Sequence, residues 1–236
     1  MRIHRIRRYF TSAYLLESED RLALVDAGLW RGHAPAILRR IAALGRHPRE
    51  LALVVVTHPH LDHFGGIAPL RDGLQFDVVS HPDAAAAIAT GEKLVSPALR
   101  PSARILEALA ELSFPYLHFH GAGPVMPVTD GTSLRPWGVP GRILHTPGHS
   151  PWCISLLLDD GTAFIGDLAL GKQAPWGRPS APTMAVSLDR VVASWQKIVD
   201  AGATAIFPAH GAPFSAAELA DVMRRTSRRR VPPPSA

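Results

Sequence analysis

The 236-residue chain has a single cysteine, Cys153, and few charged side chains, 19% of the total. One thiol cannot form an internal disulfide, which excludes a disulfide-stabilised scaffold. No apolar run reaches the roughly eighteen residues that a membrane-spanning helix needs. The basic N-terminal segment also lacks the apolar stretch of a signal peptide. These absences lead us to expect a cytoplasmic protein with no membrane partner.

The formal net charge of +5 comes from the two ends of the chain. Without nine terminal arginines, 16 of the 25 basic residues remain against 20 acidic ones, so the rest of the chain carries about −4. The nine are Arg2, Arg5, Arg7, Arg8, Arg224, Arg225, Arg228, Arg229 and Arg230. A nucleic-acid groove needs basic residues gathered on the folded body. We therefore do not expect nucleic acid as a partner, and RNA binding through RRTSRRR is a secondary option.

Apolar runs and helical periodicity alternate along the chain, and hydrophobic residues make up 47% of it. The β-branched run at 50–58 predicts a strand buried on both faces. The helical spacing of apolar residues at 33–45 predicts an amphipathic helix. Residues 3–18 and 21–28 are expected to be two strands joined by a hairpin turn. The order of elements predicts an α/β fold whose sheets carry helices on their outer faces.

The expected organisation is one domain over residues 1–227. A helical cap is expected as an insertion at 92–125, because this segment has prolines and aromatic residues near its ends and lies between core elements. The basic, proline-rich tail at 228–236 is expected to be disordered.

The segment VVVTHPHLDHFGG, residues 54–66, contains three histidines and an aspartate within six positions. Neutral imidazole and carboxylate are good ligands for zinc or a similar divalent ion. Side chains alternate in an extended segment, so His58 and His60 point the same way. Asp62 and His63 follow a change of direction and can face a second point. The pattern predicts two metal ions side by side, each of which needs further ligands.

Three later positions can supply those ligands, since each lies where an apolar strand is expected to end. They are His149 in HTPGHS, Asp167 in FIGDL and His210 in FPAHG. All three can therefore converge on one edge of the sheets. His145, which opens HTPGHS, is expected to be a structural hydrogen-bond partner.

The ordered set HxHxDH, GH, GD and AHG resembles the metallo-β-lactamase superfamily of hydrolases, and the similarity extends from AYLLES and LVDAG near the start to His210. The resemblance implies an αββα sandwich with two Zn²⁺ ions per chain at one edge, with Fe or Mn as alternatives. The implied ligands of the first ion are His58, His60 and His149. Those of the second are Asp62, His63 and His210, with Asp167 between the two ions. Asp26 is implied to orient a ligand imidazole.

The resemblance also implies a reaction, in which a hydroxide that bridges the metals cleaves an ester, thioester or lactone of a small apolar substrate. We expect Asp62 to act in catalysis as well as in metal binding. Other functions stay open: a mononuclear-iron persulfide dioxygenase, a phosphodiesterase or RNA-processing nuclease, and last a non-enzymatic scaffold. The oligomeric state is open too, with a homodimer as one option.

The cap at 92–125 and the loop at 168–184 are expected to select the substrate, because the metal-binding loops are shared by the whole superfamily. Their apolar residues are Leu94, Leu99, Phe114, Tyr116, Phe119, Trp176 and Met184. Such a wall would favour an apolar acyl or ring substrate. Lys172 and Arg178 offer a second option, in which they contact a carboxylate or phosphate.

Overall fold

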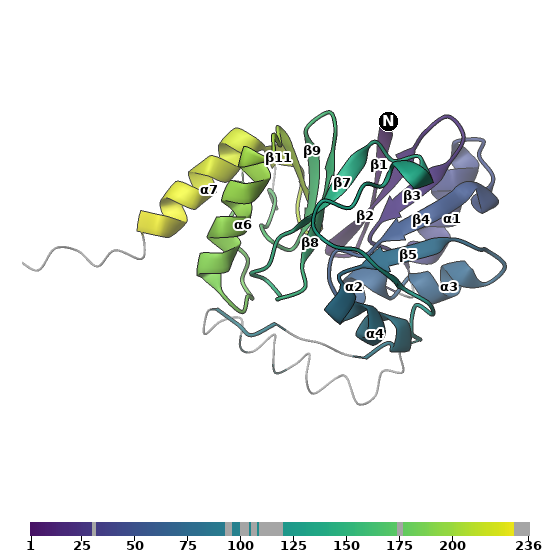
Figure 1. Cartoon of the computed structure of the whole chain (residues 1–236), viewed down its shortest axis with the longest axis horizontal. Helices are drawn as coiled ribbons and strands as arrows, with labels where there is room; N and C mark the ends of the chain where they lie inside the picture. The colour runs from purple at the N-terminus through teal and green to yellow at the C-terminus, as the bar shows by residue number, and fades with distance from the viewer. Residues whose placement is uncertain are drawn as a thin grey trace, which may run out of the picture.

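Two β-sheets lie face to face, with helices on both outer sides (Figure 1). The computed structural model describes residues 1–29, 32–92, 96–99, 104, 108, 120–173 and 177–228. The first sheet has the strand order β1-β2-β3-β4-β5-β6, and the second has the order β11-β10-β9-β8-β7. This is the αββα sandwich expected from the sequence. No helix in these described ranges is long and apolar enough to cross a membrane.

The first sheet is antiparallel at its start and parallel from β3 onward. Its strands are β1 (Arg2–Arg8), β2 (Thr11–Glu17), β3 (Leu22–Val25), β4 (Leu51–Val55), β5 (Asp77–Ser80) and β6 (Met126–Pro127). The helical segments among them are α1 (His33–Ala43), η1 (Pro48–Glu50), α2 (Leu61–Phe64), α3 (Ile67–Arg71) and α4 (Pro82–Thr90). Because parallel strands point the same way, the loops that follow β3, β4 and β5 emerge at one edge of the sheet.

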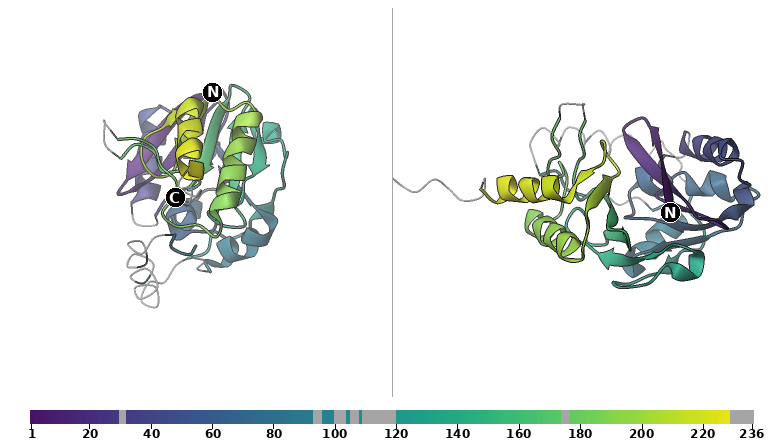
Figure 2. Two further views of the ribbon diagram at one scale, coloured as in Figure 1. Left: turned by 90° about the vertical axis from the view of Figure 1, so that its left-hand side faces the viewer. Right: turned by 90° about the horizontal axis from the view of Figure 1, so that it is seen from above.

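The second sheet is covered by α6 and α7, which face the viewer in the left view of Figure 2. Its strands are β7 (Gly141–His145), β8 (Ile154–Leu158), β9 (Thr162–Gly166), β10 (Ala205–Pro208) and β11 (Phe214–Ser215). The helical segments in this half of the chain are η3 (Arg135–Trp137), α6 (Leu188–Asp200) and α7 (Ala216–Arg228). β9 and β10 pair in parallel, so the loops after them also emerge together.

Three apolar clusters fill the spaces between the layers. On β2 the alternation of side chains is direct: Leu15 packs under the helices of the first sheet, whereas Tyr14 and Leu16 face the second sheet. On the far side Trp195 of α6 is fully buried against the second sheet. Both sheets are thus covered on two faces, which explains the continuous apolar runs in the sequence.

The expectation of one strand over residues 3–18 is wrong, because the chain reverses at Tyr9 and Phe10. Arg8 pairs with Thr11, so β1 and β2 form a hairpin around these two aromatic residues. Tyr9 adopts a φ of 56°, in the left-handed region that tight hairpin turns use. The turn contains none of the glycine, asparagine or aspartate residues that usually occupy such a position, so no residue pattern indicates a reversal here.

The predicted helical cap at 92–125 falls largely outside the described residues. Residues 96–99 are described, and they run beside residues 183–185 through an isolated antiparallel bridge between Ala98 and Met184. Arg104 and Ala108 are helical. In the predicted tail, Arg228 is the last residue of α7, and residues 229–236 lie outside the described part.

Candidate metal centre

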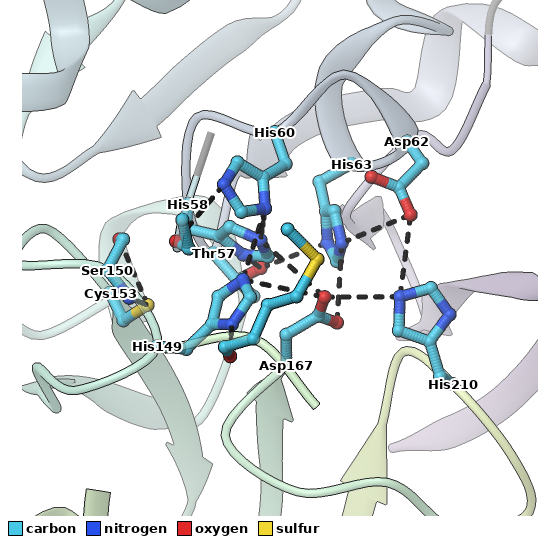
Figure 3. Close-up of polar contacts among 12 residues, drawn as sticks. Thr57, His58, His60, Asp62, His63, His149, Ser150, Cys153, Asp167 and His210 are labelled. Atoms are coloured by element: carbon cyan, nitrogen blue, oxygen red, sulfur yellow. Dashed lines mark hydrogen bonds and ion pairs between the residues drawn. The ribbon is translucent and has the colours of Figure 1, made fainter. Parts of the chain in front are cut away.

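The seven predicted ligands come together at the edge where β4, β9 and β10 end (Figure 3). His58 follows β4 by three residues, Asp167 follows β9 directly, and His210 follows β10 by two. The ligand atoms form two groups, and within each group all the atoms lie within 4.8 Å of one another. The first group is His58, His60, His149 and Asp167, and the second is Asp62, His63 and His210.

In the first group, three imidazole nitrogens converge. Nδ1 of His60 lies 2.9 Å from Nε2 of His58 and 3.1 Å from Nε2 of His149. Oδ2 of Asp167 lies 3.8 Å from Nε2 of His58 and 3.6 Å from Nε2 of His149. His58 and His149 are buried.

The second group lies on the other side of Asp167. Nε2 of His210 is 3.1 Å from Oδ2 of Asp167 and 3.4 Å from Oδ2 of Asp62. Nε2 of His63 is 3.4 Å from Oδ1 of Asp167 and 3.7 Å from Oδ2 of Asp62. The carboxylate of Asp167 therefore faces both groups, with Oδ2 toward the first and both oxygens toward the second.

Backbone carbonyls bind the outer nitrogens of two of these histidines. Nδ1 of His149 donates to the carbonyl of Met184 over 2.7 Å, and Nδ1 of His210 donates to the carbonyl of Phe10 over 3.0 Å. A neutral imidazole carries only one proton. Since that proton is on Nδ1 in both rings, the neutral rings present a lone pair at Nε2, toward the centre of each group.

Asp26 and Thr57 orient two further imidazole rings, those of His63 and His58, through their Nδ1 atoms. Asp26 accepts the backbone N–H of Thr57 over 2.8 Å and Nδ1–H of His63 over 2.8 Å. The Thr57 hydroxyl donates to Asp26 over 2.9 Å and can then accept Nδ1–H of His58, 3.1 Å away. Both rings again direct Nε2 inward, which is the arrangement typical of metal-ligating histidines.

This donor set fits a divalent cation in each group. In the described part of the chain, Nε2 of His63 and Oδ1 of Asp167 are buried polar atoms with no hydrogen-bond partner. A buried polar atom without a partner is costly, and a cation bound by both atoms, which lie 3.4 Å apart, would satisfy them. In the first group, Nδ1 of His60 faces Nε2 of both His58 and His149, and one proton on Nδ1 could form a hydrogen bond to only one of them. Imidazole and carboxylate are suitable donors for zinc and for similar transition metals.

The three histidines of the first group have lowered pKa values, which favour the neutral form of each ring. Burial lowers the pKa of His149, and it lowers the pKa values of His58 and His60 well below the ordinary range. Neighbouring histidines add to this effect, because a second positive charge close by is unfavourable. Neutral rings are the form that binds metal.

The second group has the opposite tendency. Burial alone would lower the pKa of His63, but the carboxylates of Asp167 and Asp26 raise it well above its usual value. Burial also opposes protonation of His210, yet Asp167 raises its pKa to about 9. Burial would raise the pKa of Asp167, but His210 and His63 hold it well below its usual range. In the absence of a cation, protons on His63 and His210 balance the carboxylates.

Glycines allow the metal-binding loops to approach one another closely. A Cβ at Gly66 would lie 2.2 Å from the carbonyl oxygen of Ala27, and a Cβ at Gly148 would lie 2.5 Å from the backbone nitrogen of Val191. Gly148 also has a φ of 149°, which side chains of L-residues rarely adopt. These contacts explain the glycines in the FGG and PGH segments.

Other sequence expectations have mixed outcomes. Lys172, one of the two cations of the second substrate option, pairs with Glu218 of α7 over 2.6 Å, and that option stays a prediction. His145 contacts the carbonyl of Pro151 over 3.0 Å, in the structural role expected for it. Leu99 and Met184 are described, and the other apolar residues proposed for the substrate wall lie outside the described part.

Of the groups that hold the candidate ligands in place, the sequence indicated Asp26, which contacts His63, and not the others. Thr57 precedes the first histidine of the motif and was not singled out, although a hydroxyl beside HxHxDH is a signal that could have been used. Ser96 contacts His60 from a segment with no motif. The carbonyls of Phe10 and Met184 could not have been found, because every residue carries a carbonyl.

Comparison with known proteins agrees with this geometry. The sequence profile of the metallo-beta-lactamase superfamily matches residues 6–210. The chain is 26% identical over 211 residues to the beta-lactamase-like protein 2 homolog of Drosophila melanogaster, covering 85% of this chain and 58% of that protein. It is 26% identical over 203 residues to an atrochrysone carboxyl ACP thioesterase of Aspergillus fumigatus, covering 86% and 51%. It is 31% identical over 132 residues to a hydroxyacylglutathione hydrolase of Rhodopseudomonas palustris, covering 56% and 39%.

The chain thus spans about half the length of the curated relatives it matches. Among solved structures, an archaeal metallo-beta-lactamase superfamily protein from Sulfolobus tokodaii superposes with a TM-score of 0.70 at 19% identity, over 94% of this chain and 85% of that one. This similarity shows a common fold. Since the profile covers most of the chain and the fold agrees, the chain belongs to the metallo-β-lactamase superfamily.

Proposed function

We propose that the protein is a dinuclear metal-dependent hydrolase that cleaves an ester, thioester or lactone of a small apolar substrate. Two Zn²⁺ ions per chain are our first choice, with iron or manganese as alternatives. One observation carries the proposal: the carboxylate of Asp167 faces two separate groups of buried or partly buried imidazole donors at 3.1–3.8 Å.

In this proposal each donor group holds one ion. The ligands of the first ion are His58, His60 and His149. Those of the second would be Asp62, His63 and His210, and the Asp167 carboxylate would contribute to both. When bound, the ions polarise a substrate carbonyl and lower the pKa of coordinated water to roughly 7. The proposed reaction therefore needs no serine or cysteine nucleophile. Burial raises the pKa of the Cys153 thiol to about 12, so this side chain is unsuited to that role.

Asp62 is the residue that we assign to catalysis as well as to metal binding. Its side chain is 20% exposed, compared with 11% for Asp167, so it is the more open of the two carboxylates. Its Oδ2 lies 3.4 Å from Nε2 of His210, which keeps that oxygen at the second group. In the proposed reaction Asp62 would accept the proton that the attacking water loses and pass it to the leaving group, a role that suits a partly exposed carboxylate.

Exposed apolar side chains on two sides of the centre support an apolar substrate. Tyr9 and Phe10 are 62% and 58% exposed, and the Phe10 ring stacks on His210 with 5.7 Å between ring centroids. Leu99 and Val186 are 37% and 41% exposed, and the backbone N–H of Val186 donates to the carbonyl of His149. Apolar walls around a few polar groups are typical of small-molecule sites.

The relatives guide the choice of bond. An acyl-carrier-protein thioesterase and a hydroxyacylglutathione hydrolase are both among them, so we rank a thioester ahead of a lactone or an oxygen ester. Because the chain covers about half of each relative's length, the acyl carrier is left open.

The test is hydrolysis by protein that has been stripped with a chelator and reloaded with Zn²⁺, Fe²⁺ or Mn²⁺. A panel of aryl and alkyl thioesters, lactones, oxygen esters and phosphodiesters is offered to each form, and bound metal is counted by elemental analysis. We expect about two ions per chain and metal-dependent cleavage of an apolar thioester. Metal-loaded protein that cleaves no acyl substrate would refute the proposal. One bound iron with oxygen uptake on a persulfide would replace it with the dioxygenase alternative.

A further inference from the structure

His60 differs from the other ligand histidines in which nitrogen it directs inward. Its Nδ1 faces His58 and His149, whereas the other four rings direct Nε2 toward the centre. A ring that binds through Nδ1 must carry its proton on Nε2 when it is neutral. That proton points away from the metal groups and needs an acceptor.

Ser96 supplies this acceptor. Its Oγ lies 3.3 Å from Nε2 of His60, and the residue is only 2% exposed. Ser96 belongs to none of the loops that carry the candidate ligands, and its sequence surroundings carry no motif. Its position depends on how residues 96–99 are anchored.

Residues 96–99 pair with residues 183–185, the segment whose Met184 carbonyl accepts a hydrogen bond from His149. Ala98 forms a bridge with Met184, the N–H of Leu99 donates to the carbonyl of Thr183 over 3.0 Å, and the N–H of Ala185 donates to the carbonyl of Pro97 over 2.9 Å. We call residues 96–99 and 183–185 together the strap. Met184 lies at its centre, and it is the residue whose carbonyl accepts Nδ1–H of His149 over 2.7 Å.

We propose that Ser96 is a positioning residue for His60, and that the strap fixes the outer nitrogens of two of the first ion's three histidine ligands, His60 and His149. One side of the strap acts through the Ser96 hydroxyl and the other through the Met184 carbonyl. The third ligand, His58, is held independently by Thr57. This inference rests on the proposed function, because it concerns how the chain binds the first ion.

The strap gives the two ions different kinds of support. The second group is held by Asp26 and by the Phe10 carbonyl, which belong to the first sheet and its hairpin. Two ligands of the first group depend instead on residues 96–99, which lie between α4 and β6, and on residues 183–185, which precede α6. The strap also carries Leu99, and Val186 follows it directly; both are exposed apolar residues. A substrate that contacts these residues therefore also contacts the element that orients His60 and His149.

The experiment is a stepwise Co²⁺ titration of chelator-treated protein, followed by visible absorption, which reports the coordination of each ion. His149→Ala and His210→Ala identify which step belongs to which group. In Ser96→Ala we expect the affinity of the step that His149→Ala abolishes to fall by about 10- to 100-fold, with a changed absorption band. The step that His210→Ala abolishes should be unaltered. Ser96→Thr, which keeps the hydroxyl, should restore the first step.

Ser155→Ala is the matched control, since Ser155 is another fully buried serine whose hydroxyl bonds a side chain, Thr146, over 2.8 Å. It should leave both titration steps unaltered. Equal weakening of both steps in Ser96→Ala, or no change in either, would overturn the inference while leaving the proposed function intact. A wild-type protein that takes up no metal would overturn both.

A second measurement requires no variant. In the nitrogen–proton spectrum of the wild-type protein loaded with Zn²⁺, His60 should show a protected proton on Nε2, because Ser96 covers it. His149 should show one on Nδ1, bonded to Met184. Rapid exchange of the His60 proton, with the His149 proton still protected, would contradict a role for Ser96 even if Ser96→Ala did not fold.

Discussion

Asp26 accepts a hydrogen bond from Nδ1 of His63 over 2.8 Å, and both residues are buried. The same carboxylate accepts the backbone N–H and the hydroxyl of Thr57. Asp26 has a φ of 55°, a left-handed conformation that is uncommon outside glycine. A strained backbone at such a position is maintained by its surroundings and is typical of functional sites. Asp26 thus connects the end of β3 to the loop that carries four of the ligands.

Replacing Asp26 by asparagine should weaken the binding of the second ion. Asparagine keeps the size of the side chain but removes the charge that orients the protonated Nδ1 of His63. Loss of such a partner typically lowers metal affinity by about 10- to 100-fold. Metal titration of Asp26→Asn should show this decrease in the step that belongs to His210.

Asp77→Asn is the control for this prediction. The Asp77 carboxylate accepts a hydrogen bond from Nε1 of Trp137 over 2.8 Å, away from the metal groups. Its substitution should leave both metal-binding steps unaltered. Comparable losses in the two variants would mean that Asp26 acts through general stability alone.

Removal of His149 should empty the first group only. His149→Ala takes away one of three converging imidazoles and leaves Asp62, His63 and His210 in place. We expect bound metal to fall from about two ions to about one per chain, measured by elemental analysis after dialysis. His145→Ala is the control from the same segment, since His145 contacts the Pro151 carbonyl and no metal ligand. Two ions in His149→Ala would contradict the ligand assignment.

Metal binding should release protons from the second group but not from the first. Carboxylates raise the pKa of His63 well above its usual value and that of His210 to about 9, so both carry a proton at pH 7. Burial lowers the pKa of His58, His60 and His149, so these are already neutral. The second ion should therefore displace about two protons at pH 7.

Calorimetry in buffers of different ionisation enthalpy measures this release. Affinity for the second ion should fall as the pH is lowered below about 9, because protons then compete for His210. Affinity for the first ion should be insensitive to pH over the same range. Equal proton release in both steps would show that the two groups do not differ in this way.

The metal-free protein should become less stable as the pH rises. A histidine whose folded pKa exceeds the unfolded value of 6.5 stabilises the fold when it is protonated, so its contribution is complete below 6.5. For His210 this contribution is lost as the pH rises through about 9. Thermal unfolding of chelator-treated protein should show the decline between these pH values. A melting temperature that rises over this interval would contradict the sign.

Much of the site could be predicted from the sequence because metal chemistry restricts the residue types. Only a few side chains bind a divalent ion, and strand ends bring them to one edge, so His58 and Asp167 could be paired although more than a hundred residues separate them. The layers could be predicted for a similar reason, since alternation on β2 assigns Leu15 and Tyr14 to opposite faces.

The rest of the fold and of the site depends on contacts between residues far apart in the chain, which no local sequence pattern indicates. The turn at Tyr9 relies on a strained conformation that the local residues do not favour. Lys172 pairs with a carboxylate far along the chain, on Glu218, and no local sequence pattern indicates this partner. Ser96 resembles any other serine until the pairing with Met184 places it beside His60. Such partners are set by tertiary structure.

Gly166, at the end of β9, lies so close to Thr57 and His58 that an added methyl group should displace these residues. A Cβ at Gly166 would lie 2.7 Å from Oγ1 of Thr57 and 3.4 Å from Nδ1 of His58, and Gly166 has a φ of 54°. Gly166→Ala should therefore both destabilise the fold and lower affinity for the first ion. Gly202→Ala is the control, since Gly202 also has a positive φ, 99°, but no atom within 4 Å of its added Cβ. It should cost about 1 kcal/mol of unfolding free energy from backbone strain alone, with metal binding unaltered. The comparison combines denaturant unfolding with metal titration, and equal metal affinity in the two variants would show that the approach to Thr57 does not position His58.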